Sequence, residues 1–271
     1  VIDNFISEYE QGRTPNPCVI CNSKLKFDAL YRLGVRDLLD ARSDACAEAD
    51  GTSGKTDIAE AEPELYVATG HYAVTERDPS GRYILRKAAD RSKDQTYFLS
   101  TLTQEQLSRT LFPLGGLTKT EVREIASSLG LVTAKKRESQ DICFVPGGDY
   151  TSFIRGYTGK EYPKGDFVDT SGNVLGRHTG IINYTVGQRK GLGLALGRPA
   201  YVQDIDPAGN RVIIGDNETL FTRELTSSDF NWVSMDAPHG DIRADVRIRY
   251  RHTEAPAEVI PLAAGRIRVI F

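Results

Sequence analysis

Three cysteines have the type and spacing that could do chemistry. Cys18 and Cys21 form a CxxC pair, and Cys143 lies far downstream in the run Ser139–Phe144. A CxxC pair places two sulfurs about one helical turn apart, which suits structural zinc, thiol–disulfide exchange and iron–sulfur ligation alike. A structural zinc site needs four ligands, whereas the remaining cysteine, Cys46, and the four histidines stand singly in the sequence. The spacing therefore favours a reactive thiol or an iron–sulfur ligand over structural zinc.

The residues around the CxxC pair predict a helix that begins at the cysteines. Asn16 suits the N-cap and Pro17 the first helical position, so we expect a helix from Pro17 to Leu33. Both thiols would then lie in its first turns, where unpaired backbone N–H groups and the positive end of the helix dipole favour the thiolate. Lys24 and Lys26 add positive charge nearby. These surroundings favour a nucleophilic sulfur.

The composition is that of a globular intracellular protein. The chain has 271 residues and a formal net charge of −3, which is enough material for two or three small domains. No stretch approaches the roughly 18 apolar residues of a membrane span, and no signal peptide is visible. The few cysteines do not form the framework of a disulfide-rich secreted domain. We therefore expect a cytoplasmic protein without a membrane partner.

A polar stretch interrupts the first part of the chain. Residues 40–63 are rich in Ala, Asp, Glu, Ser and Gly, so they cannot bury enough apolar surface to order themselves, and we expect a flexible insertion. Within it, Gly51–Thr56 imitates a phosphate-binding loop. The pattern GxxxxGK[ST] would need glycine at the position of Ala49, and a preceding strand is missing. We therefore predict no nucleotide site here, and Cys46 as an exposed bystander.

The first clear strand follows the insertion. The apolar run Glu64–Val74, broken by Gly70, is typical of a buried strand in a parallel sheet. Ligands gather at the carboxyl ends of such strands, where Gly70 and His71 would lie. A single histidine is more often structural than functional, so this position alone leaves both roles open.

Helical signals come next. Lys93-Asp94-Gln95 reads as a turn before a helix, with Asp94 as its cap, and Thr118–Glu121 is a capping box. The second helix has one apolar face and ends at Gly130. It leads to the basic triplet Lys135–Arg137, which is either a solvated surface or a contact for RNA phosphates near Cys143.

The second half of the chain predicts two further domains. Residues 132–200 have a mixed α+β pattern, with a short helix at Asp149–Arg155, a turn-rich strand region and an RNA-facing loop at Gln188–Lys190. Residues 201–271 read as the short strands and turns of a small β-barrel. Its clearest strand is Val246–Arg251, which would place Arg247, Arg249 and Arg251 on one face. That face is either solvated or, in a domain attached to an RNA-modifying site, a phosphate-binding stripe.

Seven segments in order resemble the tRNA-specific 2-thiouridylase family. They are Thr14–Phe27, Ala68–Tyr72, Lys93–Leu99, Phe112–Gly115, Gly130–Lys136, Ser139–Phe144 and Tyr184–Gly193. Any one of them is weak evidence, but seven in series are strong. Two features of the family are absent from the sequence, namely its Ser-Gly-Gly-Val-Asp-Ser-Ser type loop, which grips the pyrophosphate of ATP, and the last stretch of its C-terminal barrel.

The resemblance implies an α/β fold in three parts. We expect a partial adenine-nucleotide domain of the HUP or PP-loop type over residues 1–131, with the insertion 40–63. A small α+β central domain would cover residues 132–200, and an incomplete C-terminal β-barrel would cover residues 201–271. Because the pyrophosphate loop is absent, we expect this chain alone to bind ATP negligibly and not to thiolate tRNA.

The resemblance also implies an activity and a set of site residues. Family members thiolate the wobble uridine 34 of tRNA with ATP and Mg²⁺, by adenylating the C2 oxygen and transferring sulfur from a cysteine persulfide supplied by a sulfur-carrier protein. Cys143 matches the persulfide cysteine and Cys21 its partner, which would leave a disulfide between them. Gly70 matches an ATP contact. The positions that match tRNA contacts are Asn16, Pro17, Cys18, His71, Lys93, Asp94, Gln95, Arg249 and Tyr250.

Three alternatives remain open on the sequence. Cys18, Cys21 and Cys143 could ligate a [4Fe-4S] cluster with one open iron that binds sulfide. A thioredoxin-like oxidoreductase would also use CxxC at a helix start, although it would need neither Cys143 nor a barrel. The chain could finally be a tRNA-binding module without catalysis of its own.

Overall fold

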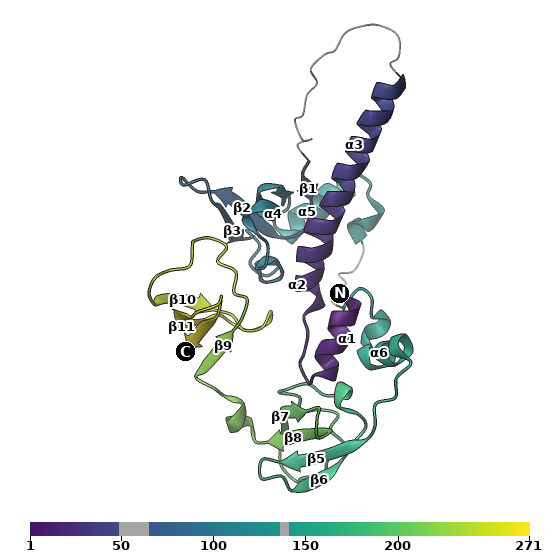
Figure 1. The fold of residues 1–271 in the computed structure, drawn as a ribbon, viewed down its shortest axis with the longest axis vertical. Coiled ribbons are helices and arrows are strands. Elements are labelled where there is room, and N and C mark those ends of the chain that lie inside the picture. The colour runs from purple at the N-terminus through teal and green to yellow at the C-terminus, as the bar shows by residue number, and fades with distance from the viewer. Residues whose placement is uncertain (49–64, 136–140) are drawn as a thin grey trace. The chain divides into compact units, whose positions relative to one another are not determined.

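The structure is a computed structural model that describes residues 1–48, 65–135 and 141–271 (Figure 1). The chain divides into two compact units. Unit 1 contains residues 1–18, 138–225 and 270–271, and unit 2 contains residues 19–137 and 226–269. Among the described residues, no helix is both long and apolar enough to cross a membrane.

Unit 1 joins the N-terminal helix to the middle of the chain. Helix α1 (Ile2–Glu10) buries Phe5, Ile6 and Tyr9 in one cluster with Val145, Ile154 and Ile182. Helix α6 (Tyr150–Thr158) supplies Ile154, and the Asp149 side chain caps its start by accepting a hydrogen bond from the Ser152 amide at 3.0 Å. The predicted helix at 149–155 is therefore present. The apolar face of α1 packs against residues 145–182, and both belong to unit 1.

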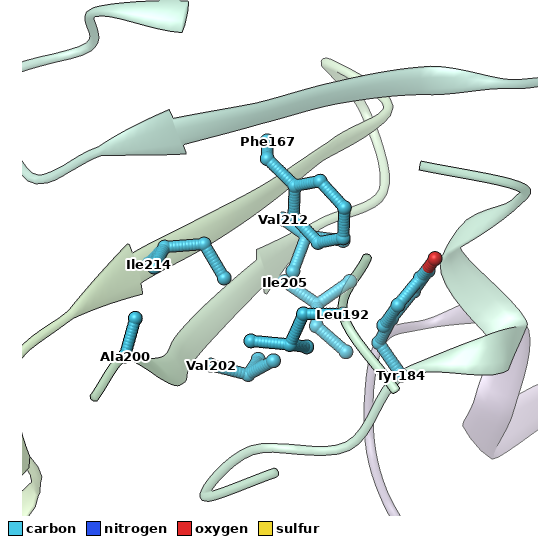
Figure 2. Packing of buried hydrophobic residues seen from close by; sticks show 8 residues of the cluster. All are labelled: Phe167, Tyr184, Leu192, Ala200, Val202, Ile205, Val212 and Ile214. Carbon is cyan, nitrogen blue, oxygen red and sulfur yellow. The ribbon is translucent and has the colours of Figure 1, made fainter. Parts of the chain in front are cut away.

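A four-stranded sheet forms the other half of unit 1. Its order is β6 (Val174–His178), β5 (Gly165–Asp169), β8 (Arg211–Gly215) and β7 (Tyr201–Asp206). β5 and β8 run parallel, and the outer pairs are antiparallel. Figure 2 shows its core, in which Phe167, Val202 and Val212 are fully buried. Each such side chain contributes about 1.5 to 3 kcal/mol by leaving water.

This sheet changes two expectations. The hairpin of β7 and β8 is present as predicted, but it pairs with β5 and β6, so the sheet crosses the expected boundary at residue 200. The region from Gly180 to Gly197 contains a 3-10 turn, Ile181–Asn183, and a loop in place of the expected strands. Leu192, Leu194 and Leu196 pack on the sheet core. The loop is therefore held by the contacts of these side chains and not by backbone pairing with a neighbouring strand.

Unit 2 begins with one long helical run. Helix α2 (Pro17–Ile20) starts at the division between the units, a π-helix follows over Cys21–Ala29, and α3 covers Leu30–Glu48. The start at Pro17 is confirmed, whereas the predicted end at Leu33 is wrong. The helix continues through Gly34. A Cβ at this position would lie 2.9 Å from Leu65 Cδ2, so glycine here allows a close approach of Leu65 and does not mark the end of the helix. Residues 40–48 are therefore helical, and the rest of the expected insertion, with Gly51–Thr56, lies outside the described residues.

Short elements complete the nucleotide-domain part of unit 2. Strand β1 (Val67–Ala68) pairs in parallel with β4 (Thr110–Leu111), and β2 (Ala73–Arg77) forms a hairpin with β3 (Tyr83–Lys87). The helices are a 3-10 turn at Thr96–Leu99, α4 (Gln104–Ser108), α5 (Lys119–Ser128) and a 3-10 turn at Val132–Lys135. The core is made of Phe27, Ala73, Leu99, Leu102 and Leu107. The predicted parallel strand is thus present, although only two residues of it pair.

The C-terminal segment adds a second four-stranded sheet. Its order is β10 (Ile242–Val246), β11 (Ala255–Pro261), β12 (Ile267–Ile270) and β9 (Glu224–Ser227). Within unit 2 this segment is fastened to the nucleotide-domain part by polar contacts to its backbone. Arg82 donates to the carbonyls of Trp232 and Val233 at 2.6 and 3.0 Å, and Asn231 donates to those of Ser100 and Leu102, both at 2.9 Å. These bonds fix residues 231–233 against Arg82, just before β3, and against the segment that follows the 3-10 turn.

Candidate active site and RNA interface

Cys21 lies where the helical run changes character. It is the first residue of the π-helix, it is partly buried, and it belongs to no disulfide within the described part of the chain. Cys18 and Cys143 are exposed. In a π-helix the amide of residue i+5 donates to the carbonyl of residue i, and the Leu30 amide bonds the Leu25 carbonyl in this way. Such helices are uncommon and concentrate at functional sites. The predicted nucleophile therefore stands at a local departure from regular helix.

Side chains tie the backbone on both sides of Cys21. The Asn22 amide nitrogen donates to the Phe98 carbonyl at 3.0 Å, and Asn22 is only 2% exposed. The Gln106 amide donates to the Ser23 carbonyl at 2.8 Å. These bonds fasten the first turn of the π-helix to the Thr96–Leu99 turn and to α4. They orient the backbone that carries the Cys21 thiol.

His71 and Gly70 lie at the carboxyl end of β1, as predicted. The His71 ring makes a 2.8 Å hydrogen bond from Nδ1 to Thr69 Oγ1, and its centroid is 6.0 Å from that of Phe27. Burial, together with repulsion from Lys26, lowers the pKa of His71 to about 4. The imidazole is therefore neutral at pH 7, so it can hydrogen-bond RNA but brings no positive charge.

Gly70 leaves the backbone open to a ligand. It is exposed, and a Cβ there would meet Leu114 Cδ1 at 3.6 Å, which is an ordinary contact. An exposed glycine at the carboxyl end of a parallel strand fits the approach of an adenosine, as expected of a nucleotide-binding domain. The residues present thus fit one side of an ATP site.

The side chains of Asp94 and Gln95, in the Lys93–Gln95 turn, bond neighbouring backbone of the fold. Asp94 is 4% exposed and accepts hydrogen bonds from the Ala88 amide at 2.9 Å and the Thr96 hydroxyl at 2.6 Å. Gln95 exchanges two bonds with the Tyr72 backbone, at 2.9 and 3.0 Å. Asp94 and Gln95 therefore position the turn beside His71. Lys93, which is half-buried, carries the charge of this turn.

Arg249 and Tyr250 lie against the same part of unit 2. The Tyr250 ring centroid is 4.4 Å from that of Phe98 and 6.0 Å from that of Tyr97. Gln95 and Tyr250, which belong to the two segments that resemble tRNA contacts, are 155 positions apart in the sequence. The 3-10 turn that follows Gln95 brings these two segments together.

The predicted strand Val246–Arg251 is wrong. Strand β10 ends at Val246, and a turn follows in which the His252 amide donates to the Arg249 carbonyl at 3.0 Å. Arg247 points to Glu254, with 2.7 Å between Nη2 and Oε1. The alternation that a strand would give is lost, so the three arginines form no common stripe. Arg249 is exposed, while Arg247 belongs to an ion pair.

Cys143 belongs to unit 1, where its neighbours anchor it. Phe144 packs edge-on against Phe5 at 5.3 Å between centroids, and Val145 is buried in the same cluster. Cys18 also belongs to unit 1 and Cys21 to unit 2.

Of the basic triplet, Lys135 is described, while residues 136–140 lie outside the described residues. No group of three Cys, His, Asp or Glu side chains that could hold a metal is found within residues 1–48, 65–135 and 141–271.

Asn16 and Pro17 open the helical run, with Pro17 buried and Asn16 partly exposed.

The Gln188–Lys190 loop is held at its base by bonds from the Gly187 amide to the Val202 carbonyl and from the Val202 amide to the Gln188 carbonyl, at 2.8 and 2.9 Å. Arg189 borders a hollow of about 420 Å³ in unit 1. Both arrangements leave polar groups accessible to RNA.

Sequence reasoning missed Asn22, Phe98 and Gln106. Their roles depend on contacts between residues 76 and 83 positions apart, for which no local pattern exists. The one available signal was the aromatic pair Tyr97 and Phe98 beside the Lys93–Gln95 turn.

Comparisons with known proteins account for the whole chain. Three family models match in order: the tRNA methyl transferase HUP domain over residues 1–47 and 54–147, the tRNA methyl transferase PRC-barrel domain over 151–216, and the aminomethyltransferase beta-barrel domain over 222–271. A protein of Clostridioides difficile named tRNA-specific 2-thiouridylase MnmA is 44% identical over 272 residues, which cover 100% of this chain and 68% of that protein. The chain belongs to the tRNA-specific 2-thiouridylase family.

Other 2-thiouridylases agree with this assignment. The MnmA of Acetivibrio thermocellus is 45% identical over 100% of this chain and 69% of its own length, and that of Acidobacterium capsulatum is 50% identical over 97% and 65%. The chain thus spans about two thirds of its relatives. The predicted α/β class, with a parallel sheet followed by a central domain and a C-terminal barrel domain, is confirmed, and the central domain matches a PRC-barrel model. Neither four-stranded sheet closes into a barrel within the described residues.

Proposed function

We propose that this chain provides the sulfur-transfer and RNA-binding parts of an enzyme that thiolates C2 of the wobble uridine 34 in tRNA. Family membership supports the reaction class, a tRNA sulfurtransferase. The observation that carries the proposal is the meeting of two segments that resemble tRNA contacts, Lys93–Gln95 and Arg249–Tyr250, on one aromatic cluster of unit 2. Phe98 of that cluster also bonds the residue next to Cys21.

The proposed cofactor is ATP with Mg²⁺, which would supply activation of the uridine C2 oxygen by adenylation. Gly70 would hold the adenosine side of this group. Its exposed backbone admits a ligand, and the neutral His71 ring beside it can donate to or accept from RNA without attracting phosphate. Asp94 and Gln95 keep this edge in place through Tyr72 and Ala88.

The two cysteines would perform the transfer. The terminal sulfur of a persulfide on Cys143 forms a bond to uridine C2, and the activated oxygen leaves with its electron pair. The Cys21 thiolate then attacks Cys143 Sγ. The bond from Sγ to the transferred sulfur breaks, and its electron pair stays on the 2-thiouridine. The product is a Cys21–Cys143 disulfide, which an external thiol must reduce, and a persulfide carrier protein must reload Cys143.

A competing route uses Cys18 as well. Three thiolates can hold a [4Fe-4S] cluster whose fourth iron binds sulfide. Anaerobic reconstitution followed by iron and labile-sulfide analysis separates the two routes. The persulfide route predicts full thiolation activity without iron. It also predicts that a Cys18→Ser variant retains this activity.

The test uses a chimera in which this chain replaces the matching region of the Clostridioides difficile relative. The chimera is given tRNA, ATP, Mg²⁺ and a persulfide donor, and 2-thiouridine is measured by nucleoside mass spectrometry. We expect thiolation that Cys21→Ser and Cys143→Ser each abolish and Cys46→Ser leaves intact. After one turnover without reductant, digestion should yield a linked Cys21–Cys143 peptide. Thiolation that survives either serine variant would contradict the roles of the two cysteines.

The other proposed properties follow from this reaction. We place the enzyme in the cytoplasm, because its proposed substrate is a tRNA. RNA binding without catalysis is the second candidate function, favoured by the aromatic and basic residues gathered at Tyr250. The chain itself, assayed by filter binding with labelled tRNA, should bind even when it does not thiolate.

A further inference from the structure

A buried amide directly follows the proposed nucleophile. Asn22 is 2% exposed, and its side chain donates to the carbonyl of Phe98, 76 positions away, at 3.0 Å. Buried amides are retained where their hydrogen bonds specify a backbone arrangement, because leaving one unpaired is unfavourable. An apolar residue would fill this space without that requirement. Asn22 therefore specifies how the first turn of the π-helix is held.

A π-helix and an α-helix are related by a simple change of register. A π-helix bonds residue i+5 to residue i, and an α-helix bonds residue i+4 to residue i, so the two differ by a shift of one residue. Such a shift turns the side chains at one end by about 100° relative to the other end. Asn22 and the bond from Gln106 to the Ser23 carbonyl hold the N-terminal end, while buried Phe27 holds the C-terminal half. The orientation of Cys21 depends on which register is held.

The same residue that receives Asn22 faces the RNA-binding segment. Phe98 accepts the Asn22 bond with its backbone carbonyl, and its ring packs on Tyr250 at 4.4 Å between centroids. Tyr97 adds a second contact, with its hydroxyl 3.5 Å from the Ile248 carbonyl. Anything that fixes Tyr250 therefore fixes Phe98, and with it the acceptor of the Asn22 bond.

We propose that Asn22 is a positioning residue for Cys21, and that RNA bound at Tyr250 acts through Phe98 and Asn22 to hold the π-helix register and with it the Cys21 thiol. This inference rests on the proposed function, in which Cys21 reacts and Tyr250 binds tRNA. It adds a connection between the two. Asn22 holds the nucleophile without RNA, and bound RNA strengthens that hold.

The experiment measures the reactivity of Cys21 as the sole thiol. The chain carries Cys18→Ser, Cys46→Ser and Cys143→Ser, and its alkylation by iodoacetamide is followed by mass spectrometry from pH 6 to 9, with and without saturating tRNA. We expect tRNA to slow alkylation at least threefold. Asn22→Ala should react at least threefold faster than the parent without RNA, and RNA should no longer slow it. Direct coverage of Cys21 by RNA would slow both proteins equally.

Two further variants separate positioning from stability. Phe98→Leu keeps the backbone carbonyl but removes the ring, so its rate without RNA should stay within twofold of the parent while the effect of RNA disappears. Asn231→Ala is the matched control, because Asn231 also donates to carbonyls of this region, those of Ser100 and Leu102, without touching the π-helix. It should lower the melting temperature and keep the parent's alkylation rates.

The outcomes distinguish this inference from the proposed function. If tRNA binds but the rate is unchanged by RNA, or if Asn22→Ala and Phe98→Leu keep the RNA effect, the connection is overturned and the proposed function stands. If tRNA does not bind, the RNA part of the proposed function fails, and the rates without RNA decide the positioning role alone. Should Asn22→Ala fail to fold by circular dichroism, Phe98→Leu decides.

Discussion

His71 shows how one side chain's surroundings set its chemistry. The ring lies among Phe27, Phe112 and the Thr69 hydroxyl, with the Lys26 ammonium as the nearby charge. Desolvation and that like charge both disfavour the imidazolium. The pKa of about 4 therefore removes His71 from phosphate binding at neutral pH and leaves it a hydrogen-bonding role.

This pKa predicts a pH dependence of stability. The folded-state value of about 4 lies below the value near 6.5 in an unfolded chain, so protonation favours unfolding. The stabilisation is complete above about pH 6.5 and declines as the pH falls through about 4. Melting temperatures from pH 7.5 to 4 should fall less steeply for His71→Gln than for the parent. Replacement of the exposed His239 by Gln should leave the parent's slope.

Gly115 and Gly116 are adjacent, but only at Gly115 would a larger side chain collide with a neighbouring segment. At Gly115 a Cβ would lie 1.9 Å from the Ala73 carbonyl oxygen, whereas at Gly116 it would meet nothing within 4 Å. Gly115→Ala forces the loop away from β2 and should cost about 3 kcal/mol or more in the free energy of unfolding. Gly116→Ala should change it by less than about 0.5 kcal/mol. Urea unfolding of both variants tests this, and equal midpoints would contradict the close approach.

Local chemistry was the part of the site that sequence could predict. The helix start at Pro17 and the position of His71 after a strand each depend on a few neighbouring residues, and the structure has them. The predicted Asp94 cap is wrong, because Gln95 is the N-cap of the 3-10 turn and Asp94 instead bonds Ala88 and Thr96. The Asn22 to Phe98 bond and the packing of Tyr250 depend on contacts between distant residues. No periodicity or motif encodes such pairs, which is why these contacts emerge only from the fold.

Elements followed the same division. Both the α5 capping box and the β7–β8 hairpin are local patterns, and both are present. The π-helix was not predicted, because a π-turn and an α-turn draw on the same residue preferences and differ only in register. The strand at 246–251 failed for a different reason. Its arginines alternate with apolar residues, but the Arg247 to Glu254 ion pair and the turn at Arg249 prevail over that alternation.

Helix α5 allows its cap to be tested with little interference from packing. None of its residues is buried, and the Thr118 hydroxyl oxygen accepts from the Glu121 amide at 3.3 Å. Thr118→Ala should cost about 1 kcal/mol of helix stability. Thr120→Ala, in the exposed first turns, should have the opposite sign because alanine favours helix. Hydrogen exchange of the α5 amides measures both, and matching changes in the two variants would contradict the cap.

At the scale of the molecule, one carboxylate joins distant parts of unit 2. Glu254 accepts hydrogen bonds from Lys87 of β3 and from Arg247. These bonds hold the pKa of Glu254 below its ordinary value, and the bond from Lys87 has the larger effect. The C-terminal segment is thereby fastened beside the 3-10 turn. Its proposed RNA contacts are carried on a framework that the nucleotide-domain part supplies.

The chain has a formal net charge of −3, so RNA binding must come from local cations and not from the whole molecule. Arg249 is an exposed cation next to Tyr250, as is Arg251. Each phosphate that a cation neutralises contributes about 0.7 to 0.9 to the slope of log K against log salt, because it releases bound counterions. Arg249→Ala should therefore weaken tRNA binding and reduce this slope by up to about one phosphate. Arg243, exposed on β10 of the same segment, is the matched control, and Arg243→Ala should keep the parent's slope. Filter binding from low to physiological salt gives both slopes. An unchanged slope for Arg249→Ala, or an equal loss in both variants, would remove Arg249 from the interface and leave Tyr250 with a purely stacking role.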